Sequence, residues 1–305
     1  MSKIAFMFPG QGAQYIGMGK DFYDAVPESR RMFELASEAS GLDVAALCFE
    51  ENENINITEY TQIAMLAAEA AMLKAVEERG IKPDVTAGLS LGEYGALAAS
   101  GVMSEADIFK VVRKRGLYMQ EAVPTGGAMT AVLGLDADVI EKICEETPGI
   151  VSIANYNCPG QIVITGEEAA VSNAAKALAQ AGAKRCVPLK VSGPFHSKLL
   201  TGAGEKLGKV LADVEIREIE VPYLANVTAD YVTDKGQVKE LLEKQVSSSV
   251  RWQQTIERML ADGVDTFIEI GPGKTLSGFM RKINRDVNTI NIEKLEDLEK
   301  LVELS

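Results

Sequence analysis

The sequence predicts an α/β protein in which a parallel sheet wrapped by helices is interrupted by a smaller inserted domain. Short apolar segments alternate with helical patterns along most of the chain, and this alternation is typical of parallel sheets. Between residues 126 and 193 the order becomes β-α-β-β-α-β, which is the order of a ferredoxin-like unit. We therefore expect a large domain from residues 1–125 and 194–305 and a small domain at 126–193.

The large domain is expected to contain short buried strands that end in tight turns and helices with apolar residues three or four apart. The strands are expected at residues 4–8, 85–89 and 266–270. The helices are expected at residues 61–79, 91–100, 104–123, near 199–214 and from about 275.

The inserted domain is bounded by glycines, with Gly126-Gly127 before it and Gly193-Pro194 after it. Its strands are expected at residues 128–135, 151–155, 161–165 and 185–191. Its two helices are expected at residues 137–146 and 168–181.

The composition excludes several classes of function. The 305 residues carry a net charge of −13, whereas nucleic-acid binding requires a basic surface, so no nucleic-acid partner is expected. The single histidine excludes a metal site built on two or more imidazoles, and we expect no bound metal or cofactor. No apolar run is long enough for a signal peptide or a membrane span.

The four cysteines, at positions 48, 144, 158 and 186, are dispersed and form no C-x-x-C motif. This spacing indicates reduced thiols in a cytoplasmic protein. Cys158 is a conceivable nucleophile, but the role of a small buried apolar residue is favoured.

The segment Gly88-Leu-Ser90-Leu-Gly92 fits the G-x-S-x-G pattern between an expected strand and an expected helix. Such a turn exposes the serine at the end of the strand, and its glycines let strand and helix approach closely. The helix N-terminus offers free N–H groups to an oxyanion. Ser90 is thus a candidate nucleophile; the alternative is a serine that only caps the helix.

His196 lies just before the helix expected near 199–214 and is the only imidazole available as a base. A helix N-terminus disfavours imidazolium, so the ring is expected to be neutral and able to accept a proton. No carboxylate is near it in sequence, so an acid from elsewhere or a backbone carbonyl must orient the ring. The alternative is an ordinary, partly buried histidine.

Arg115 falls on the apolar stripe of helix 104–123, beside Val111 and Val112. An unpaired guanidinium is costly against apolar surface, so Arg115 should meet an anion. A carboxylate of the protein and a carboxylate of a substrate both satisfy this requirement.

Two glycine-rich turns resemble nucleotide-binding motifs and fail them. In Gly10-Gln-Gly12-Ala-Gln-Tyr15 a tyrosine replaces the third glycine of the dinucleotide fingerprint, and in Gly271-Pro-Gly-Lys-Thr275 the first glycine of a P-loop is missing. We interpret both as strand-to-helix turns that present N–H groups to an anion or a carbonyl.

Several of these segments together resemble the malonyl-coenzyme A:acyl carrier protein transacylases, in the family's order and over most of the chain. The matching segments are Phe8-Pro-Gly-Gln-Gly-Ala-Gln14, Thr61-Gln62, Gly88-Leu-Ser-Leu-Gly-Glu-Tyr94, Arg115-Gly116, Met119-Gln-Glu121, Asn155-Tyr-Asn157, Pro159-Gly-Gln161, Pro194-Phe-His196, Val250-Arg-Trp252 and Gly271-Pro-Gly-Lys274. The resemblance implies an α/β-hydrolase-like large domain with the ferredoxin-like insert between Arg115 and His196.

The resemblance also implies site roles. Ser90 would be acylated and His196 would be its base, with the ring oriented by the main-chain carbonyl of Gln245. The remaining roles are oxyanion-hole N–H groups from Gln11 and Leu91, a clamp on the malonyl carboxylate from Arg115, and acyl-pocket positions at Gln62, Asn157 and Phe195.

Two residues depart from the family pattern. Leu89 stands where a histidine is usual beside the nucleophile, and Ser249 stands where proline often precedes Val-Arg-Trp. The first removes any assisting imidazole, and the second is expected to loosen the turn after Gln245. Phe195 is typical of malonyl-selective members.

The resemblance implies ping-pong transfer of malonyl from coenzyme A to the acyl carrier protein of fatty-acid synthesis, with a monomeric enzyme expected. The alternatives are a free-standing acyltransferase of polyketide synthesis, a serine hydrolase, and an inactive docking module. Because both partners are acidic, we expect local positive charge from Lys184, Arg185, Lys190, Arg281, Lys282 or Arg285.

Overall fold

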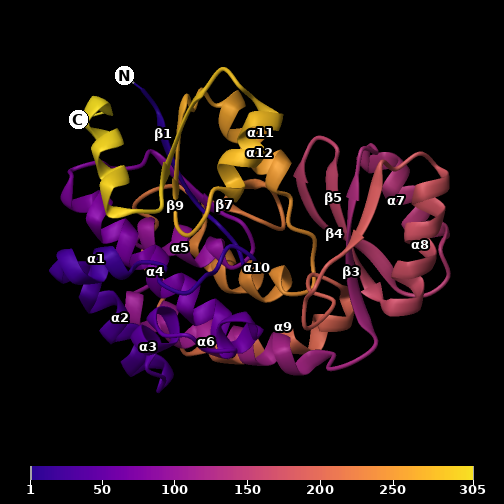
Figure 1. Ribbon diagram of the computed structural model, residues 1–305, viewed down its shortest axis with the longest axis horizontal. Helices are drawn as coiled ribbons and strands as arrows, with labels where there is room; N and C mark the ends of the chain where they lie inside the picture. The colour runs from indigo at the N-terminus through magenta and orange to yellow at the C-terminus, as the bar shows by residue number, and fades with distance from the viewer. Residues whose placement is uncertain (1, 305) are drawn as a thin grey trace.

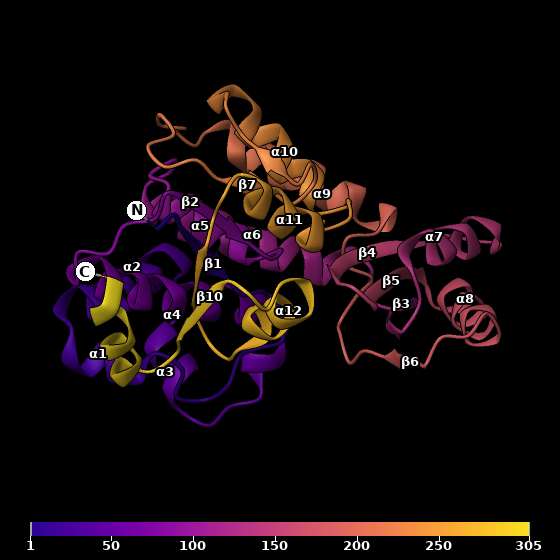
Figure 2. The same ribbon diagram turned by 90° about the horizontal axis from the view of Figure 1, so that it is seen from above.

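The computed structural model describes residues 2–304 and shows a mixed α/β protein with helices packed around a parallel sheet (Figures 1 and 2). The strands of the parallel sheet are β1 (Ile4–Phe8), β2 (Val85–Gly88), β9 (Thr266–Ile270) and β10 (Asn288–Ile292), in the order β10-β9-β1-β2. All three pairings are parallel, as the alternation of strands and helices predicted.

Helices formed by residues before 127 and after 188 pack around the parallel sheet. They are α1 (Lys20–Ala25), α2 (Pro27–Ser40), α3 (Val44–Phe49), α4 (Thr58–Glu78), α5 (Gly92–Ala99), α6 (Glu105–Ala122), α9 (Thr201–Ala212), α10 (Val238–Gln245), α11 (Trp252–Ala261) and α12 (Thr275–Ile283). Short 3-10 helices lie at Asn54–Asn56, Lys198–Leu200, Lys235–Gln237 and Leu295–Leu304, and a two-stranded ribbon joins β7 (Leu224–Ala225) to β8 (Asp230–Tyr231). No helix within residues 2–304 combines the length and apolar character needed to cross a membrane.

The two faces of the parallel sheet pack on different cores because successive side chains of a strand point to opposite faces. Phe6 and Phe8 of β1 belong to the core that includes α2, α4 and α6. Ala5 and Met7 belong to the core on the other face, with Trp252 of α11. A strand buried on both faces reads as a continuous apolar run, which is why Ile4–Phe8 was recognisable in the sequence.

A second, antiparallel sheet forms between residues 127 and 188 and lies at one end of the molecule (Figure 1). We call these residues the antiparallel unit and the other described residues the main body. Its elements are β3 (Gly127–Leu133), α7 (Ala137–Glu146), β4 (Val151–Cys158), β5 (Gln161–Glu167), α8 (Glu168–Gln180) and β6 (Arg185–Pro188), with strand order β4-β5-β3-β6.

Several strand boundaries in the antiparallel unit differ from the expected ones by one to three residues, and the differences at β4 and β6 are the largest. The strand expected at 151–155 continues to Cys158, because β4 keeps pairing with β5 across two irregularities in register. The strand expected at 185–191 ends at Pro188, because residues 189–192 leave the sheet and line the cavity described below.

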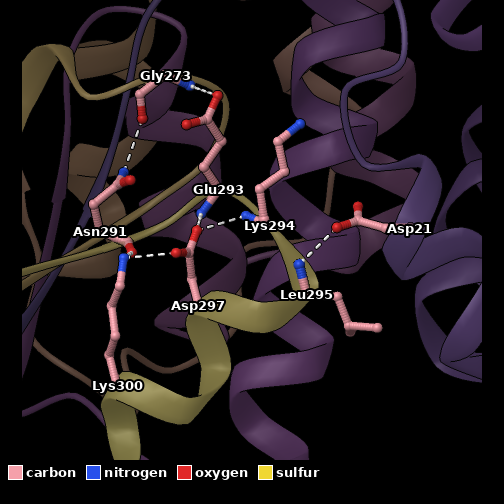
Figure 3. Close-up of polar contacts among 8 residues, drawn as sticks. All are labelled: Asp21, Gly273, Asn291, Glu293, Lys294, Leu295, Asp297 and Lys300. Atoms are coloured by element: carbon pink, nitrogen blue, oxygen red, sulfur yellow. Dashed lines mark hydrogen bonds and ion pairs between the residues drawn. The ribbon is translucent and has the colours of Figure 1, made fainter.

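The C-terminal segment is tied to earlier parts of the main body by polar contacts (Figure 3). Glu293 accepts a hydrogen bond from the Gly273 N–H at 3.1 Å, and Asn291 donates to the Gly273 carbonyl at 2.8 Å. The Leu295 N–H donates to Asp21 of α1 at 2.6 Å. The segment therefore fixes the turn that follows β9 and lies beside α1 in both ribbon views (Figures 1 and 2).

Candidate active site

Ser90 occupies a tight turn between β2 and α5. Its φ angle of 56° is in the left-handed region, which is unusual for a residue with a side chain. The turn is tight because a Cβ on Gly88 would lie 1.9 Å from the Gly92 carbonyl atoms, and a Cβ on Gly92 would lie 2.1 Å from the Phe8 oxygen. The glycines therefore permit the close approach of strand and helix that the G-x-S-x-G pattern predicted.

Asn226, directly after β7, holds this turn through two side-chain hydrogen bonds. Its Oδ1 accepts a hydrogen bond from the Ser90 N–H at 2.7 Å, and its Nδ2 donates to the Gly88 carbonyl at 2.6 Å. Asn226 is fully buried, so both bonds are shielded from water. These bonds offset part of the strain of a left-handed serine.

His196 meets Ser90 across the site. Its Nε2 lies 2.7 Å from the Ser90 Oγ, and its Nδ1 lies 2.9 Å from the Gln245 carbonyl and 3.1 Å from the Ser248 carbonyl. Two carbonyl acceptors at Nδ1 place the ring proton there, which leaves Nε2 free to accept the serine proton. Main-chain carbonyls therefore orient the imidazole where other serine enzymes use a carboxylate.

The pKa of His196 is lowered to about 4, first by burial and then by the nearby charge of Arg115. The neutral ring agrees with the expectation from the sequence, but the expected cause was the N-terminus of a following helix. Only a short 3-10 turn, Lys198–Leu200, follows directly, so burial is the main cause. A neutral imidazole near pH 7 is the form that accepts a proton.

Arg115 of α6 is 1% exposed and points into the site. Its Nη1 donates to Gln62 Oε1 at 2.8 Å, and its Nη2 donates to Gln245 Oε1 at 3.0 Å and to Ser90 Oγ at 3.2 Å. No carboxylate of residues 2–304 forms an ion pair with it, and its Nε has no hydrogen-bond partner there. Of the two anions considered for Arg115, a direct protein carboxylate is absent from the described chain.

Gln11 and Leu91 both line the cavity that Ser90 lines, and their backbone N–H groups are the ones expected in an oxyanion hole. Neither N–H group makes a hydrogen bond within residues 2–304. The Gln11 side chain donates to Thr58 Oγ1 at 3.0 Å, which holds the loop after β1 against α4. Two unpaired amides beside a serine hydroxyl have the composition of an oxyanion hole.

A cavity of about 690 Å³ opens from Ser90 and runs between the main body and the antiparallel unit. The residues expected in an acyl pocket all line it: Gln62, Asn157 and Phe195, which are 1%, 7% and 7% exposed. Apolar residues of the antiparallel unit, among them Met129 and Val163, also line it.

Leu89 lines the same cavity, and its side chain packs against the core beneath α12. Ser249 does not loosen its turn as expected, because its Oγ donates to the Ile153 carbonyl at 2.6 Å. The Val250 N–H also donates to the Ala154 carbonyl at 2.7 Å. Strand β4 thus holds the turn whose carbonyls orient His196, and it does so without a proline.

The turn at Gly271–Thr275 and the first residues of α12 present N–H groups to carboxyl groups of the protein itself. Glu269 accepts from the N–H groups of Leu276 and Ser277 at 2.9 and 2.8 Å, and Glu293 accepts from Gly273. Cys158 is fully buried within β4, in agreement with an apolar role. The six basic residues considered for partner binding are all exposed: Lys184, Arg185, Lys190, Arg281, Lys282 and Arg285.

Sequence reasoning missed Asn226 and Ser248. Asn226 follows a two-residue strand with no recognisable periodicity, and Ser248 contributes only its carbonyl. A buried asparagine in an apolar segment, Tyr-Leu-Ala-Asn226, was the one available signal, because buried amides require partners.

Comparison with known proteins agrees with this geometry. Residues 5–295 match the family model described as the acyl transferase domain. A malonyl CoA-acyl carrier protein transacylase of Bacillus subtilis is 48% identical over 98% of this chain and 96% of its own length. The crystal structure of such a transacylase from Clostridium perfringens superimposes with a TM-score of 0.96, at 45% identity, over 99% of this chain and 97% of the other.

A second similar structure is a malonyl transacylase in complex with an acyl carrier protein of a type II polyketide synthase. It has a TM-score of 0.96 and 38% identity, with full coverage of both chains. The fold and the serine–histidine site define an acyltransferase. This chain belongs to the acyl transferase family and, within it, to the malonyl-CoA:acyl carrier protein transacylases.

Proposed function

We propose that this enzyme transfers malonyl groups from coenzyme A to the phosphopantetheine thiol of an acyl carrier protein, through a malonyl ester on Ser90. The observation that carries the proposal is the 2.7 Å contact between Ser90 Oγ and His196 Nε2 at the base of a cavity that also holds the Arg115 guanidinium. The names of the relatives and the carrier-protein complex of one of them support the acyl group and the acceptor.

In the first half-reaction, Ser90 Oγ attacks the thioester carbonyl carbon while His196 Nε2 accepts the hydroxyl proton. The N–H groups of Gln11 and Leu91 stabilise the oxyanion that forms. The carbon–sulfur bond then breaks, and His196 protonates the departing coenzyme A thiolate. The Gln245 and Ser248 carbonyls keep the imidazole oriented throughout.

In the second half-reaction, the carrier-protein thiol gives its proton to His196 and attacks the malonyl ester. Ser90 then leaves as the alkoxide and recovers the proton from His196. The reaction exchanges one thioester for another of similar energy, so it should run in both directions.

Arg115 selects the acyl group in this proposal. Its Nε and the remaining donors of its fork pair with the malonyl carboxylate. Gln62 Oε1 holds one side of the guanidinium by accepting a hydrogen bond from Nη1 at 2.8 Å. Asn157 and Phe195 form part of the wall of the acyl pocket. Phe195 leaves little room for a branched acyl group.

The proposal includes a finer description of the fold. Residues 1–125 and 194–305 form an α/β-hydrolase-like catalytic domain, and residues 126–193 form a ferredoxin-like insert. The strand order β4-β5-β3-β6 and the alternation of strands and helices support the second assignment. We further propose a cytoplasmic monomer that uses coenzyme A thioester as substrate and no bound cofactor or metal.

The test of the nucleophile is a mass measurement. After mixing with malonyl-coenzyme A, the protein should gain the mass of one malonyl group on Ser90, and Ser90→Ala should gain none. Transfer of malonyl to carrier protein by Ser90→Ala would refute the mechanism.

The hydrolase alternative differs in the fate of the acyl-enzyme. A transferase should hold the malonyl ester in water and lose it rapidly when carrier protein is added. A lifetime that carrier protein does not change would favour the hydrolase.

The same chemistry serves fatty-acid and polyketide synthesis, so a panel of carrier proteins separates these pathways. Positive charge at the exposed lysines and arginines of residues 184–190 and 281–285 should make carrier-protein affinity fall steeply with added salt. Equal affinity at low and high salt would exclude a role for this charge.

A further inference from the structure

Glu93 is a buried carboxylate beneath the nucleophile turn that the proposed mechanism does not use. It lies on α5 and is 1% exposed. Its Oε2 accepts hydrogen bonds from the Asn226 N–H at 3.1 Å and from Gln245 Nε2 at 2.6 Å, while its Oε1 has no partner within residues 2–304. A buried carboxylate is costly unless a positive charge offsets it.

The nearest such charge is Arg115, which is separated from Glu93 by one neutral amide. Arg115 Nη2 donates to Gln245 Oε1 at 3.0 Å, and the same amide donates from Nε2 to Glu93 Oε2 at 2.6 Å. The amide dipole therefore connects the two charges without a direct ion pair. A direct ion pair would occupy the guanidinium, whereas this arrangement leaves Nε of Arg115 without a partner within residues 2–304, and Arg115 lines the cavity.

The pKa values of the other titratable groups around Glu93 are all shifted toward the neutral form. Burial raises the pKa of Tyr94, on α5 itself, and of Tyr223, just before β7, and the pKa of His196 is lowered to about 4. Glu69 of α4 contacts α5 at Gly95, and burial raises its pKa well above its ordinary value. Glu93 and Arg115 therefore form an isolated pair of opposite charges in the buried network.

We infer that Glu93 is the counter-charge of Arg115, connected to it through the side-chain amide of Gln245. We further infer that binding of a carboxylate-bearing acyl group to Arg115 is coupled to uptake of one proton by Glu93. This inference rests on the proposed role of Arg115. The proton comes from solvent and converts the Glu93 carboxylate to the carboxylic acid. No other bond is formed or broken.

The coupling follows from the charges. A substrate carboxylate places a second anion against one buried guanidinium, and two buried anions sharing one cation raise the pKa of the weaker acid. Burial already raises the pKa of Glu93 to about 7, so a further rise brings protonation into the working range. The buried network then carries no net charge either before or after malonyl binds, whereas an acyl group without a carboxylate takes up no proton.

The experiment is calorimetric binding to the Ser90→Ala protein, which cannot be acylated. Malonyl-coenzyme A is titrated near pH 7.5 in two buffers of different ionisation enthalpy, and coenzyme A, with the same phosphates, is the reference ligand. We expect more proton uptake with malonyl-coenzyme A than with coenzyme A, and loss of this difference when Glu93→Gln is added. Equal uptake for both ligands, or an unchanged difference in the Glu93→Gln protein, would overturn the inference.

Glu69→Gln is the matched control, because Glu69 also has a fully buried carboxyl group but lacks the bond to Gln245. It should retain the extra proton uptake. Arg115→Ala separates this inference from the proposed function. If Arg115→Ala weakens malonyl binding while Glu93→Gln leaves proton uptake unchanged, the carboxylate clamp stands and the coupling is rejected. If Arg115→Ala does not weaken malonyl binding, the clamp itself fails.

A second measurement covers the case in which Glu93→Gln does not fold. In the unmodified enzyme, the ratio of kcat/KM for malonyl- to acetyl-coenzyme A should fall between pH 7 and pH 9, by up to about tenfold per unit. The phosphates common to both substrates cancel in this ratio. A ratio that is constant over this range would overturn the coupling.

Discussion

The two sheets of this protein contribute to the site in different ways. The parallel sheet of the main body ends at Ser90, and the buried polar groups that surround this serine come from the main body. The antiparallel sheet packs one face on its own helices and turns apolar side chains of the other face toward the cavity. Its direct link to the chemistry is β4, which holds the turn that orients His196.

The difference teaches that the reacting groups and the apolar wall of the cavity come from different sheets, although Arg115, Gln62 and Phe195 of the main body also line the cavity. Groups that must be placed within tenths of an ångström lie in a dense hydrogen-bond network, where each bond fixes the next. Groups that only form the wall of the substrate cavity lie on a pleated sheet surface, where small changes of side-chain volume are tolerated. Changes to the groups that hold Ser90 and His196 in place should therefore alter rate constants, and changes on the cavity face of the antiparallel unit should alter affinity.

The largest effect is expected for His196→Ala. Loss of a general base costs about 10²- to 10⁴-fold, and the chain has no second histidine to replace it. The measurement is the single-turnover rate of Ser90 acylation at saturating malonyl-coenzyme A. A rate within a few-fold of the unmodified enzyme would remove His196 from the mechanism.

Asn226→Ala should have the next largest effect, because it removes both bonds that hold the Ser90 turn. A displacement of about 1 Å at the nucleophile costs up to about 10²-fold, so we expect acylation to slow by about 10- to 100-fold with little change in affinity. Asn226→Asp keeps the acceptor for the Ser90 N–H and should slow acylation less. A variant that loses affinity and keeps its rate would contradict the division between the two regions.

The pH dependence of acylation should follow His196. The imidazole must be neutral, and its pKa is about 4, so the rate should be independent of this group from pH 5 to pH 8 and fall about tenfold per unit below pH 4. A rate that falls near pH 6.5 would show that the ring titrates as if exposed.

The same shift affects stability. The unfolded histidine takes up a proton near pH 6.5 and the folded one only near pH 4, so the unfolded state binds more protons between these values. The free energy of unfolding should therefore rise with pH across this window, and less so in His196→Ala. Denaturant titrations at pH 4.5 and 7 make this comparison.

The smallest effect is expected on the antiparallel side. Val163→Ala removes two methyl groups from the cavity wall, each worth about 0.8 kcal/mol when buried, so the half-saturating concentration of malonyl-coenzyme A should rise about 4- to 15-fold. Its acylation rate at saturation should not change. Ile164→Val, on the opposite face of β5, is the control, and it should lower stability by about 0.5–1.5 kcal/mol and leave affinity unchanged.

The sequence predicts much of this arrangement because the signals are local. The Ser90 turn, the helix that carries Arg115 and the element order of residues 126–193 all depend on residues close together in the chain. The support beneath the site is not local: Asn226 bonds to Ser90 across 136 residues, and Gln245 bonds to Glu93 across 152. No periodicity encodes such pairs. Strand β10 was also missed, because its sequence Asn-Thr-Ile-Asn-Ile has a weak apolar pattern.

The position of β1 has a consequence for the order of folding. Strand β1 pairs with β2 on one side and with β9 on the other. Both edges of β1 are therefore paired only after Thr266, the partner of Ile4, has been synthesised. The antiparallel unit pairs only within residues 127–188 and can form while the rest of the chain is still being synthesised. One edge of β1 stays open during that interval and exposes unpaired backbone to neighbouring chains. Slow translation of the segment between β2 and β9 should therefore increase the yield of aggregates more than slow translation after β9.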